Sequence, residues 1–358
     1  MSRTSLGQHP RCRIVPPYIH RAVAQNGSPP QRAAAQRTLA ADQTFRALRM
    51  AQPPQPARAA ARRPRLEVME VRPRRTIFDA HGTQNLPGDV IRVEGGPSSQ
   101  DAAVNEAYDG LGLTFEFYRD VLERNSIDDE GLPLDGVVHF GQGYDNAFWD
   151  GRQMVFGDGD IFNRFTASLD VIGHELTHGV TEDEAQLMYF NQSGALNESM
   201  SDVFGSLIKQ RTRNETAEQA DWLIGSELFA GTNLQGVALR SMKEPGTAFD
   251  DPLLGKDPQP AHMDDFVRTF EDQGGVHINS GIPNHAFYLV ATRLGGYAWE
   301  KAGRIWYETL RDSRVRPNTG FVRFANRTVA NAGALYGLNS PEVQAVREAW
   351  GQVGIDVA

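Results

Sequence analysis

Two histidines and a glutamate within residues 173–179 have the types and the spacing of a zinc site. His174 and His178 are four residues apart, so on a helix both imidazoles project from one face and can bind one zinc ion. Glu175 lies beside His174, where a carboxylate can act on a water molecule at the metal. Because so short a pattern also arises by chance on solvated surface helices, a zinc site requires further ligands elsewhere in the chain.

A second helix is expected to supply the third ligand. Glu198 follows His178 after nineteen residues (179–197), enough for a loop that returns a helix beside the first. Catalytic zinc sites take three protein ligands and leave the fourth position to water. Asp202 lies one turn beyond Glu198 on the same face, where it can accept the outer ring N–H of a liganding histidine. The alternative, in which both acids belong to a solvated helix face, is open at this point.

The elements that must hold these residues differ between the two halves of the chain. Residues 67–165 are predicted to form a β-rich lobe of short strands, and residues 166–358 an α-helical lobe, so the fold class is α+β. The predicted strands are 137–140, 146–149 and 153–156. Helices are predicted at 101–123, 169–180, 285–294, 298–312 and 321–334. Two more helices are predicted, one that contains Leu196 and Leu207 and is capped by Ser193, and a last one that begins at Ser340.

The N-terminal arm, residues 1–66, has its own composition. It is strongly basic: residues 1–65 contain twelve arginines and one acid, Asp42, which leaves a net charge of about −20 on the remainder. An acidic body in the same chain favours docking of the arm on its own protein over binding of nucleic acid. The prolines near Ile14 predict extended backbone, 38–50 is predicted to be a helix, and the rest is expected to be linker without a core.

Composition narrows the remaining possibilities. A hydrophobic content of 40% with 23% charged residues is typical of a soluble globular protein. No apolar run approaches the ~18 residues that span a bilayer, and the first twenty residues lack the apolar core of a secretory signal. The single cysteine, Cys12, excludes an intrachain disulfide and a cysteine-rich zinc cluster.

Several motifs in order resemble the thermolysin-like zinc metallopeptidases of the gluzincin clan, from Thr76 to the C-terminus. Besides His174-Glu175-x-x-His178, the sequence Asn146-Ala147-Phe148-Trp149 is similar to that family's edge strand, Asn197-Glu198-x-x-Ser201-Asp202 to its ligand helix, and residues 274–281 to its second catalytic signature. The nineteen-residue gap favours the endopeptidases over the related aminopeptidases. The resemblance implies two lobes, β-rich and α-helical, with the zinc helix between them at the floor of a cleft.

The resemblance also implies a role for each site residue. One catalytic zinc, held by His174, His178 and Glu198, would activate water and polarise the scissile carbonyl, with Glu175 as the base. Tyr189 and His277 would bind the developing oxyanion, and Asp272 would orient His277.

Substrate contacts follow from the same resemblance. Asn146 and Ala147 would pair with an extended substrate backbone, and Arg240 would bind a substrate carbonyl. The pocket after the scissile bond would be apolar and would prefer a hydrophobic residue; its lining is expected to be Phe162, Phe165, Val171, Ile224, Leu228 and Leu239, with Phe165 narrowing it.

The expected calcium ligands match those of the family only in part. Asp170 and Asp221 stand where the family has calcium carboxylates, but Lys209 and Ser226 stand where two more ligands are expected. The ammonium of Lys209 would replace part of the ion's charge, so a paired calcium site is doubtful.

The arm resembles the short prosegments of the protealysin-like subgroup through Pro16, Pro17 and Tyr18, although His20 stands where an apolar residue is expected. Our hypothesis is that residues 11–23 occupy the cleft until the linker is cut, near Arg62, Arg63 and Arg65. A rival is that the Cys12 thiolate binds the zinc.

The sequence thus predicts a zinc-dependent neutral endopeptidase made as a latent precursor. Its expected partners are protein or peptide substrates and its own prosegment docked in cis, with no nucleic acid and no membrane, and we expect a monomer. The expected location is outside the cell, reached without a recognisable signal peptide; the alternative is cytoplasmic. The alternative function is a non-catalytic zinc- or peptide-binding protein on the same fold.

Overall fold

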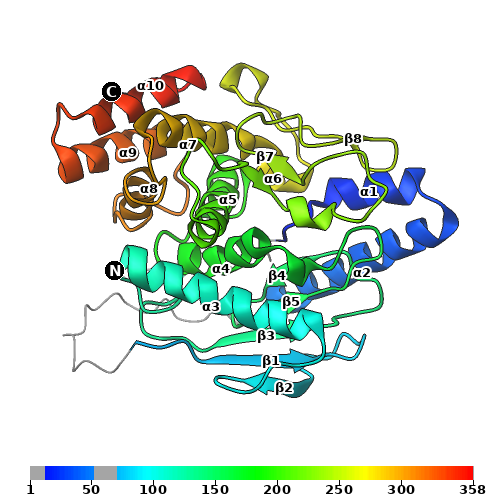
Figure 1. The fold of residues 1–358 in the computed structure, drawn as a ribbon. Helices are drawn as coiled ribbons and strands as arrows, with labels where there is room; N and C mark the ends of the chain where they lie inside the picture. Colours follow the sequence, from blue (N-terminus) through cyan, green and yellow to red (C-terminus); the bar gives the residue numbers. More distant parts are fainter. Residues whose placement is uncertain (1–12, 52–70, 358) are drawn as a thin grey trace.

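The computed structural model describes residues 13–51 and 71–357; Cys12, Arg62, Arg63 and Arg65, on which parts of the arm hypothesis rest, lie outside them. The first half of the body is built on a five-stranded sheet in the order β2-β1-β3-β5-β4 (Figure 1). The strands are β1 (Arg75–Asp79), β2 (Asp89–Val93), β3 (Leu134–Val138), β4 (Ala147–Trp149) and β5 (Gln153–Phe156). The central pairs β1–β3 and β3–β5 are parallel, and both edge strands pair antiparallel.

Alternating side chains give this sheet two buried faces. Met154 and Phe156 point into the main core, where helix α3 (Ala102–Leu122) packs, while Val155 points to the opposite face. Helix α3 begins where the Asp101 carboxylate accepts a hydrogen bond from the Ala103 amide. The predicted strands and this predicted helix are confirmed within one to three residues.

The second half of the body is helical, as predicted, and the α+β class is confirmed. Its helices are α4 (Leu169–Asp183), α5 (Asn191–Arg213), α6 (Asp272–Asn279), α7 (Gly281–Leu294), α8 (Ala302–Leu310), α9 (Phe321–Tyr336) and α10 (Pro341–Gln352). Short 3-10 turns occur at Phe165–Ala167, Ser226–Leu228 and Met263–Asp265, and two-residue strands pair as β6 (Leu223–Ile224) with β7 (Arg240–Ser241) and β8 (Asp250–Asp251) with β9 (Gly255–Lys256). The predicted Ser193 cap is wrong: α5 begins at Asn191, and the Ser193 hydroxyl donates to carbonyls of the turn before it.

Helices α4 and α5 pack unusually closely because two glycines face each other. A Cβ on Gly205 would lie 2.4 Å from the Asp170 carbonyl oxygen, and one on Gly173 would lie 3.2 Å from the Gly205 Cα. Neither position has room for a larger side chain, so the two backbones approach to the distance at which side chains of α5 reach those of α4.

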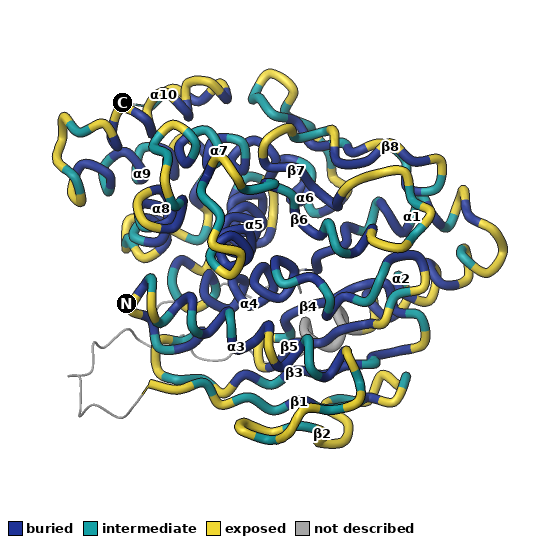
Figure 2. Tube along the Cα trace, in the orientation of Figure 1, coloured by how far each residue is buried: buried dark blue, intermediate teal, exposed yellow. Residues whose placement is uncertain are grey.

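The arm is more ordered than its composition predicts. It forms α1 (Pro17–Asn26) and α2 (Pro29–Ala51), so the predicted extended backbone is wrong from Pro17 onwards, whereas the helix predicted over 38–50 is confirmed as part of a longer one. Pro17 occupies the first helical position, where its missing N–H costs nothing, and the alanine-rich segment has high helix propensity. Ile14, Val15 and Ile19 are fully buried in the same apolar core as the body (Figure 2).

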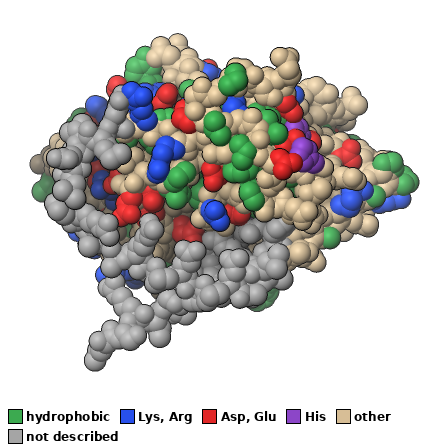
Figure 3. Space-filling model, turned by 90° about the horizontal axis from the view of Figure 1, so that it is seen from below, with side chains coloured by type: hydrophobic (Ala, Val, Ile, Leu, Met, Phe, Trp, Pro, Cys, Tyr) green, Lys and Arg blue, Asp and Glu red, His purple; other side chains and the backbone are tan. Residues whose placement is uncertain are grey.

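The two edges of the sheet differ in exposure. Edge strand β2 carries half-exposed Val90, Ile91 and Val93, and the side of the molecule on which it lies shows hydrophobic side chains scattered among acidic and basic ones (Figure 3). The other edge strand, β4, is buried. Within the described ranges no helix is long and apolar enough to cross a membrane.

Candidate active site

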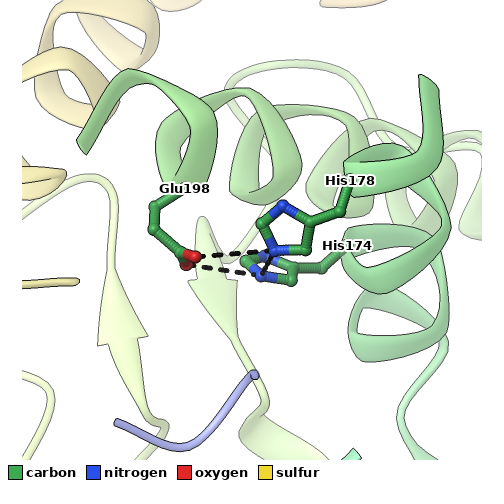
Figure 4. A group of neighbouring side chains, drawn as sticks. All are labelled: His174, His178 and Glu198. Carbon is green, nitrogen blue, oxygen red and sulfur yellow. Dashed lines mark hydrogen bonds and ion pairs between the residues drawn. The ribbon is translucent and has the colours of Figure 1, made fainter. Parts of the chain in front are cut away.

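Three side chains converge on one point between α4 and α5. The Nε2 atoms of His174 and His178 are 3.0 Å apart, and each lies 3.5 Å from an oxygen of Glu198 (Figure 4). All three residues are buried, and their ligand atoms lie within 4.8 Å of one another. Two imidazole nitrogens and one carboxylate are a typical donor set for catalytic zinc, so the residues fit the ion.

The outer nitrogens of both histidines are held in place. His174 Nδ1 lies 2.8 Å from Asp202 Oδ1, and His178 Nδ1 lies 2.7 Å from Asn197 Oδ1 and 3.0 Å from Ser201 Oγ. Carboxylate and amide oxygens at Nδ1 fix the tautomer that leaves Nε2 free for a metal. Asn197 and Ser201 were not predicted, although both flank Glu198 on one helical stretch, a signal that was available.

Asp202 is itself held by two further side chains. Arg240 donates to both of its oxygens at 2.9 Å, and Asn284 Nδ2 donates at 2.8 Å. Burial opposes the charged carboxylate, but Arg240 and then His174 outweigh burial and lower the pKa of Asp202 to about 2. Asn284 comes from α7, far along the chain, and nothing in the sequence signalled it.

Glu175 lies beside the metal ligands and is not one of them. It is fully buried, and its Oε2 accepts a hydrogen bond from the Trp149 amide of β4 at 3.0 Å. Burial raises the pKa of Glu175 to about 8, partly offset by the charge of His174.

Tyr189 and His277 meet on the other side of the site. The Tyr189 hydroxyl is hydrogen-bonded to Glu198 and lies 3.0 Å from His277 Nε2. Asp272 binds both the Nδ1 of His277, at 2.6 Å, and its amide, at 2.8 Å. Burial disfavours the imidazolium of His277, but Asp272 and Glu198 outweigh burial, so its pKa is raised. The Gln259 side chain, which was not predicted, donates to the His277 carbonyl at 2.7 Å.

The predicted substrate-binding groups all contact the backbone of the arm. Ile14 N donates to the Ala147 carbonyl at 3.4 Å, and Arg240 Nη1 donates to the Ile14 carbonyl at 2.9 Å. The Asn146 side chain accepts from Val15 N at 3.0 Å and donates to Val15 O at 3.1 Å. The arm therefore lies along edge strand β4, with bends at Ile14 and Val15, and it passes the metal ligands in Figure 4.

The predicted pocket residues form part of the same apolar core as Ile14. All six are buried: Phe162, Phe165, Val171, Ile224, Leu228 and Leu239. The Phe162 and Phe165 rings are 6.3 Å apart, edge to face. Phe229, whose ring lies 5.7 Å from Phe162, was not predicted.

The rest of the described arm is held by both apolar and charged contacts. Pro16 is buried, Pro17 and Tyr18 are half-buried, and His20 is fully buried 3.5 Å from Asn146. Burial and the nearby Arg13 lower the pKa of His20 to about 3, so a neutral imidazole fills the position expected to be apolar.

The arm also contains its own buried ion pair. Arg13 Nε lies 2.8 Å from Asp42 Oδ1 of α2, and Arg13 also donates to the Asp42 carbonyl at 2.7 Å. The Tyr144 hydroxyl donates to Asp42 at 2.7 Å. This cluster, which was not predicted, joins the segment before α1 to α2 and both of them to the body.

A buried ammonium occupies the place considered for calcium. Lys209 Nζ lies 2.9 Å from Asp170 Oδ2 and 2.9 Å from Asp221 Oδ1, and it donates to the Leu223 carbonyl at 2.7 Å. The Ser226 hydroxyl donates to Glu227 at 3.0 Å.

Comparison with known proteins agrees with this geometry. The family profile described as "Thermolysin metallopeptidase, catalytic domain" matches residues 72–182, and "Thermolysin metallopeptidase, alpha-helical domain" matches residues 185–355. The "Extracellular metalloprotease" of Pectobacterium carotovorum subsp. carotovorum is 53% identical over 350 residues, which cover 97% of each chain. "Protease PrtS" of Photorhabdus sp. (strain Az29) is 54% identical over 287 residues, 79% of this chain and 76% of that protein.

A solved structure is also similar. The "Precursor of Protealysin, Metalloproteinase from Serratia proteamaculans" matches with a TM-score of 0.86 at 52% identity, covering 96% of this chain and 99% of that one. The family resemblance seen in the motifs is thereby confirmed. The chain belongs to the thermolysin family of zinc metallopeptidases, among its protealysin-like members, and is a metalloendopeptidase with a zinc site formed by His174, His178 and Glu198.

Proposed function

We propose that the chain is the latent precursor of a neutral zinc endopeptidase whose arm blocks its own cleft. The observation that carries this proposal is that Asn146, Ala147 and Arg240 bind backbone atoms of Ile14 and Val15 rather than of a substrate. We take residues 1–66 as prosegment and linker, 67–165 as the β-rich lobe and 166–358 as the α-helical lobe.

The proposed chemistry divides between the ion and the chain. Zinc, held by His174, His178 and Glu198, would supply a Lewis acid for the scissile carbonyl and for water. Glu175 would take the proton of the attacking water and pass it to the leaving nitrogen. Its burial and its bond from Trp149 support this role because both hold the carboxylate in one place beside the ligands.

The oxyanion would be bound by Tyr189 and His277. Each group of this kind contributes roughly 10²–10³ in rate in comparable sites. The raised pKa of His277, caused mainly by Asp272 against burial, supports a protonated donor, and Asp272 fixes the direction of the ring.

The pocket supports a preference for a hydrophobic residue after the scissile bond. Ile14, whose carbonyl binds Arg240, is fully buried in the apolar core that contains Phe162, Val171 and Leu239. An isoleucine buried there supports the proposal that other large apolar side chains bind in the same place, at a gain of roughly 1.5–3 kcal/mol for full burial.

Latency, location and partners are part of the same proposal. Arg13 and Arg37 bind groups of the protein itself, which supports docking in cis over nucleic-acid binding. The relative from Pectobacterium is named as extracellular, which supports action outside the cell. We propose a monomer, because the cleft is filled by the same chain.

The proposal is tested by hydrolysis of casein or of a fluorogenic peptide after the arm has been removed. We expect hydrolysis that a chelator abolishes and that Glu175→Gln lowers by about 10²–10⁴-fold. Absence of hydrolysis by the arm-free protein would favour the non-catalytic alternative. Latency is tested separately: Pro16→Ala and Tyr18→Ala should release activity in the precursor, and Cys12→Ser should leave latency intact if the thiolate plays no part.

A further inference from the structure

We propose that the arm is bound as a substrate in the productive register, that the enzyme cuts its own Arg13–Ile14 bond, and that the Arg13–Asp42 ion pair keeps this cut slow. This inference rests on the proposed function, and it concerns a bond far from the expected maturation cuts in the linker.

The register follows from one contact at the catalytic groups. The Arg13 carbonyl oxygen lies 3.0 Å from His277 Nε2, which in turn lies 3.0 Å from the Tyr189 hydroxyl. These are the two groups proposed to bind the oxyanion. The peptide carbonyl of the arm that contacts His277, next to Tyr189, therefore belongs to the Arg13–Ile14 bond.

The contacts on the C-terminal side agree with this register. The next amide, Ile14 N, is bound by Ala147, the next carbonyl by Arg240, and the following residue, Val15, by Asn146 on both its N–H and its carbonyl. Every backbone group from the Arg13 carbonyl to the Val15 carbonyl is thus paired, and from Ile14 onwards each partner is a group proposed to bind substrate backbone. The Ile14 side chain is buried in the apolar core beside the pocket residues.

The reaction balances with water alone. The oxygen of one water molecule would bond to the Arg13 carbonyl carbon, and the bond between that carbon and the Ile14 nitrogen would break. Glu175 would carry one proton of the water to the Ile14 nitrogen as the bond breaks, and the second proton would then pass to the same nitrogen and leave it as an ammonium. The products are a new carboxylate on Arg13 and a new amino terminus on Ile14.

The structure also explains why such a bond would be cut slowly. On one side of it the Arg13 side chain is held by Asp42, with both side chains about 3% exposed, and Asp42 is held by Tyr144. On the other side, α1 packs its buried Ile19 and Val23 into the core. Both new ends would stay in place after the cut, so the amine can attack the carboxylate again and re-form the bond before either end leaves.

The test uses the full-length zinc-loaded precursor, incubated in ¹⁸O-labelled water and followed by mass spectrometry. We expect a chain that begins at Ile14 to accumulate slowly, at a rate independent of protein concentration. We also expect ¹⁸O in the Arg13 carbonyl of uncut precursor: the cut leaves one unlabelled and one labelled oxygen on the carboxylate, and re-formation of the bond expels one of them as water, so about half of the events retain the label. Peptide mapping must use a protease that does not cleave after arginine, because trypsin would introduce the label itself.

Three variants separate the parts of the inference. Glu175→Gln should show neither cut nor label. Asp42→Asn should raise net cutting by about tenfold or more, because a broken buried ion pair no longer retains the fragment 1–13. Native mass spectrometry should find that fragment bound to the wild-type protein and lost from the variant. Arg37→Gln is the matched control on α2: it removes a half-exposed arginine that contacts Gln142 and Asp160, and should change nothing.

The outcomes distinguish this inference from the proposed function. If the arm-free enzyme hydrolyses casein but the precursor shows neither an Ile14 terminus nor label at Arg13, the self-cleavage is wrong and the function stands. If the arm-free enzyme does not hydrolyse casein, both the proposed function and the self-cleavage are wrong. A cut that is slower in Asp42→Asn than in the wild type would overturn the assignment of Asp42 as a clamp.

Discussion

Helices α4 and α5, together with the segment after α5, hold two acid clusters whose negative charge is compensated in different ways. At one end, Glu198 faces His174 and His178 and fits a zinc ion. At the other end, Asp170 and Asp221 face the ammonium of Lys209, 2.9 Å from each. Both sites lie in the low-dielectric interior, where an uncompensated carboxylate is costly. One takes its cation from solution and the other from the chain.

The difference shows what each site is suited for. A metal from solution leaves room for a water and a substrate, provided that neighbouring side chains hold the ligands in position. The ammonium of Lys209 is covalently attached and is further bound to the Leu223 carbonyl, so it can only hold α4, α5 and the segment near β6 together. The first site is therefore suited to catalysis, and the second to holding these elements of the fold together.

Removal of zinc should have the largest effect. A Lewis acid stabilises the transition state by several kcal/mol, so a chelator should lower peptidase activity by about 10³-fold or more in the arm-free enzyme. One equivalent of zinc should restore it, and the melting temperature should fall and recover in parallel because binding is linked to folding. Activity that persists after zinc has been shown to be absent by elemental analysis would contradict the assignment.

Replacement of the built-in cation should come next. Lys209→Met leaves Asp170 buried without its partner, and breaking a buried pair in this way typically costs about 3–5 kcal/mol in the free energy of unfolding. Urea denaturation measures this loss. The matched control is Lys301→Met, whose half-exposed pair with Glu342 should contribute about 1 kcal/mol or less.

Calcium sharpens the same comparison. If the ammonium fills the cation's place, millimolar calcium should not raise the melting temperature of the wild type beyond the effect of magnesium. In Lys209→Met it should recover part of the loss, because Asp170 and Asp221 then face a site that has lost its ammonium, with Arg213 still paired to Asp221. A rise of many degrees in the wild type would show that calcium binds despite Lys209.

The close packing of α4 against α5 can be tested by enlarging a glycine between them. The expected loss in the free energy of unfolding is smaller than that of Lys209→Met. Gly205→Ala would place a methyl group 2.4 Å from the Asp170 carbonyl oxygen and 3.1 Å from the His174 amide, which pushes the helices apart. Such overpacking typically costs about 1–3 kcal/mol. Gly351→Ala, in α10 with nothing within 4 Å of the added carbon, should instead stabilise by about 0.5–1 kcal/mol. Equal effects of the two substitutions in urea denaturation would refute the role of close packing.

The sequence predicted the site residues whose positions follow from helical periodicity. It did not predict contacts between residues that are far apart in the sequence and meet only when the helices pack. The spacing of His174 and His178 and the position of Glu198 were enough to predict the metal ligands, because a helix fixes which residues share a face. Asn284 could not be predicted, because its contact with Asp202 arises only when α7 packs against α5.

The arm shows the opposite failure. Only 38–50 was predicted to be helical, and the prolines and low complexity elsewhere predicted extended backbone and linker. Helix α1 nevertheless forms, because Ile19 and Val23 pack into a core supplied by the body, and α2 begins earlier than predicted, at Pro29. Local composition indicates the conformation that a segment prefers in isolation. Burial of an apolar face against the rest of the protein can outweigh that preference. The Arg13–Asp42 pair joins residues on either side of α1 and has no sequence signature.

In a third cluster, nearer the surface, a histidine lies between two aspartates as Lys209 does. Its contribution to the free energy of unfolding should be the smallest of those considered. His139 lies between Asp158, 2.8 Å from its Nδ1, and Asp101, 2.7 Å from its Nε2. The hydrogen bond to Asp158 raises the pKa of His139 from 6.5 to about 9, against a lesser effect of burial. Because the pKa is higher in the folded protein than in the unfolded chain, the stabilisation is complete below pH 6.5 and is lost as the pH rises through 9.

His139→Asn isolates this contribution. Asparagine carries no charge and tolerates the positive φ of 55° at this position, so the backbone is preserved. The difference in urea midpoint between wild type and variant should be largest near pH 6 and should shrink towards pH 9.5. The effect of Lys209→Met should stay constant over that range. Burial alone would lower the pKa of the lysine, but the charges of Asp170 and Asp221 outweigh burial and keep it raised above its usual value. A His139→Asn difference that does not change with pH would mean that the histidine is neutral and that only the buried cluster uses a charged cation.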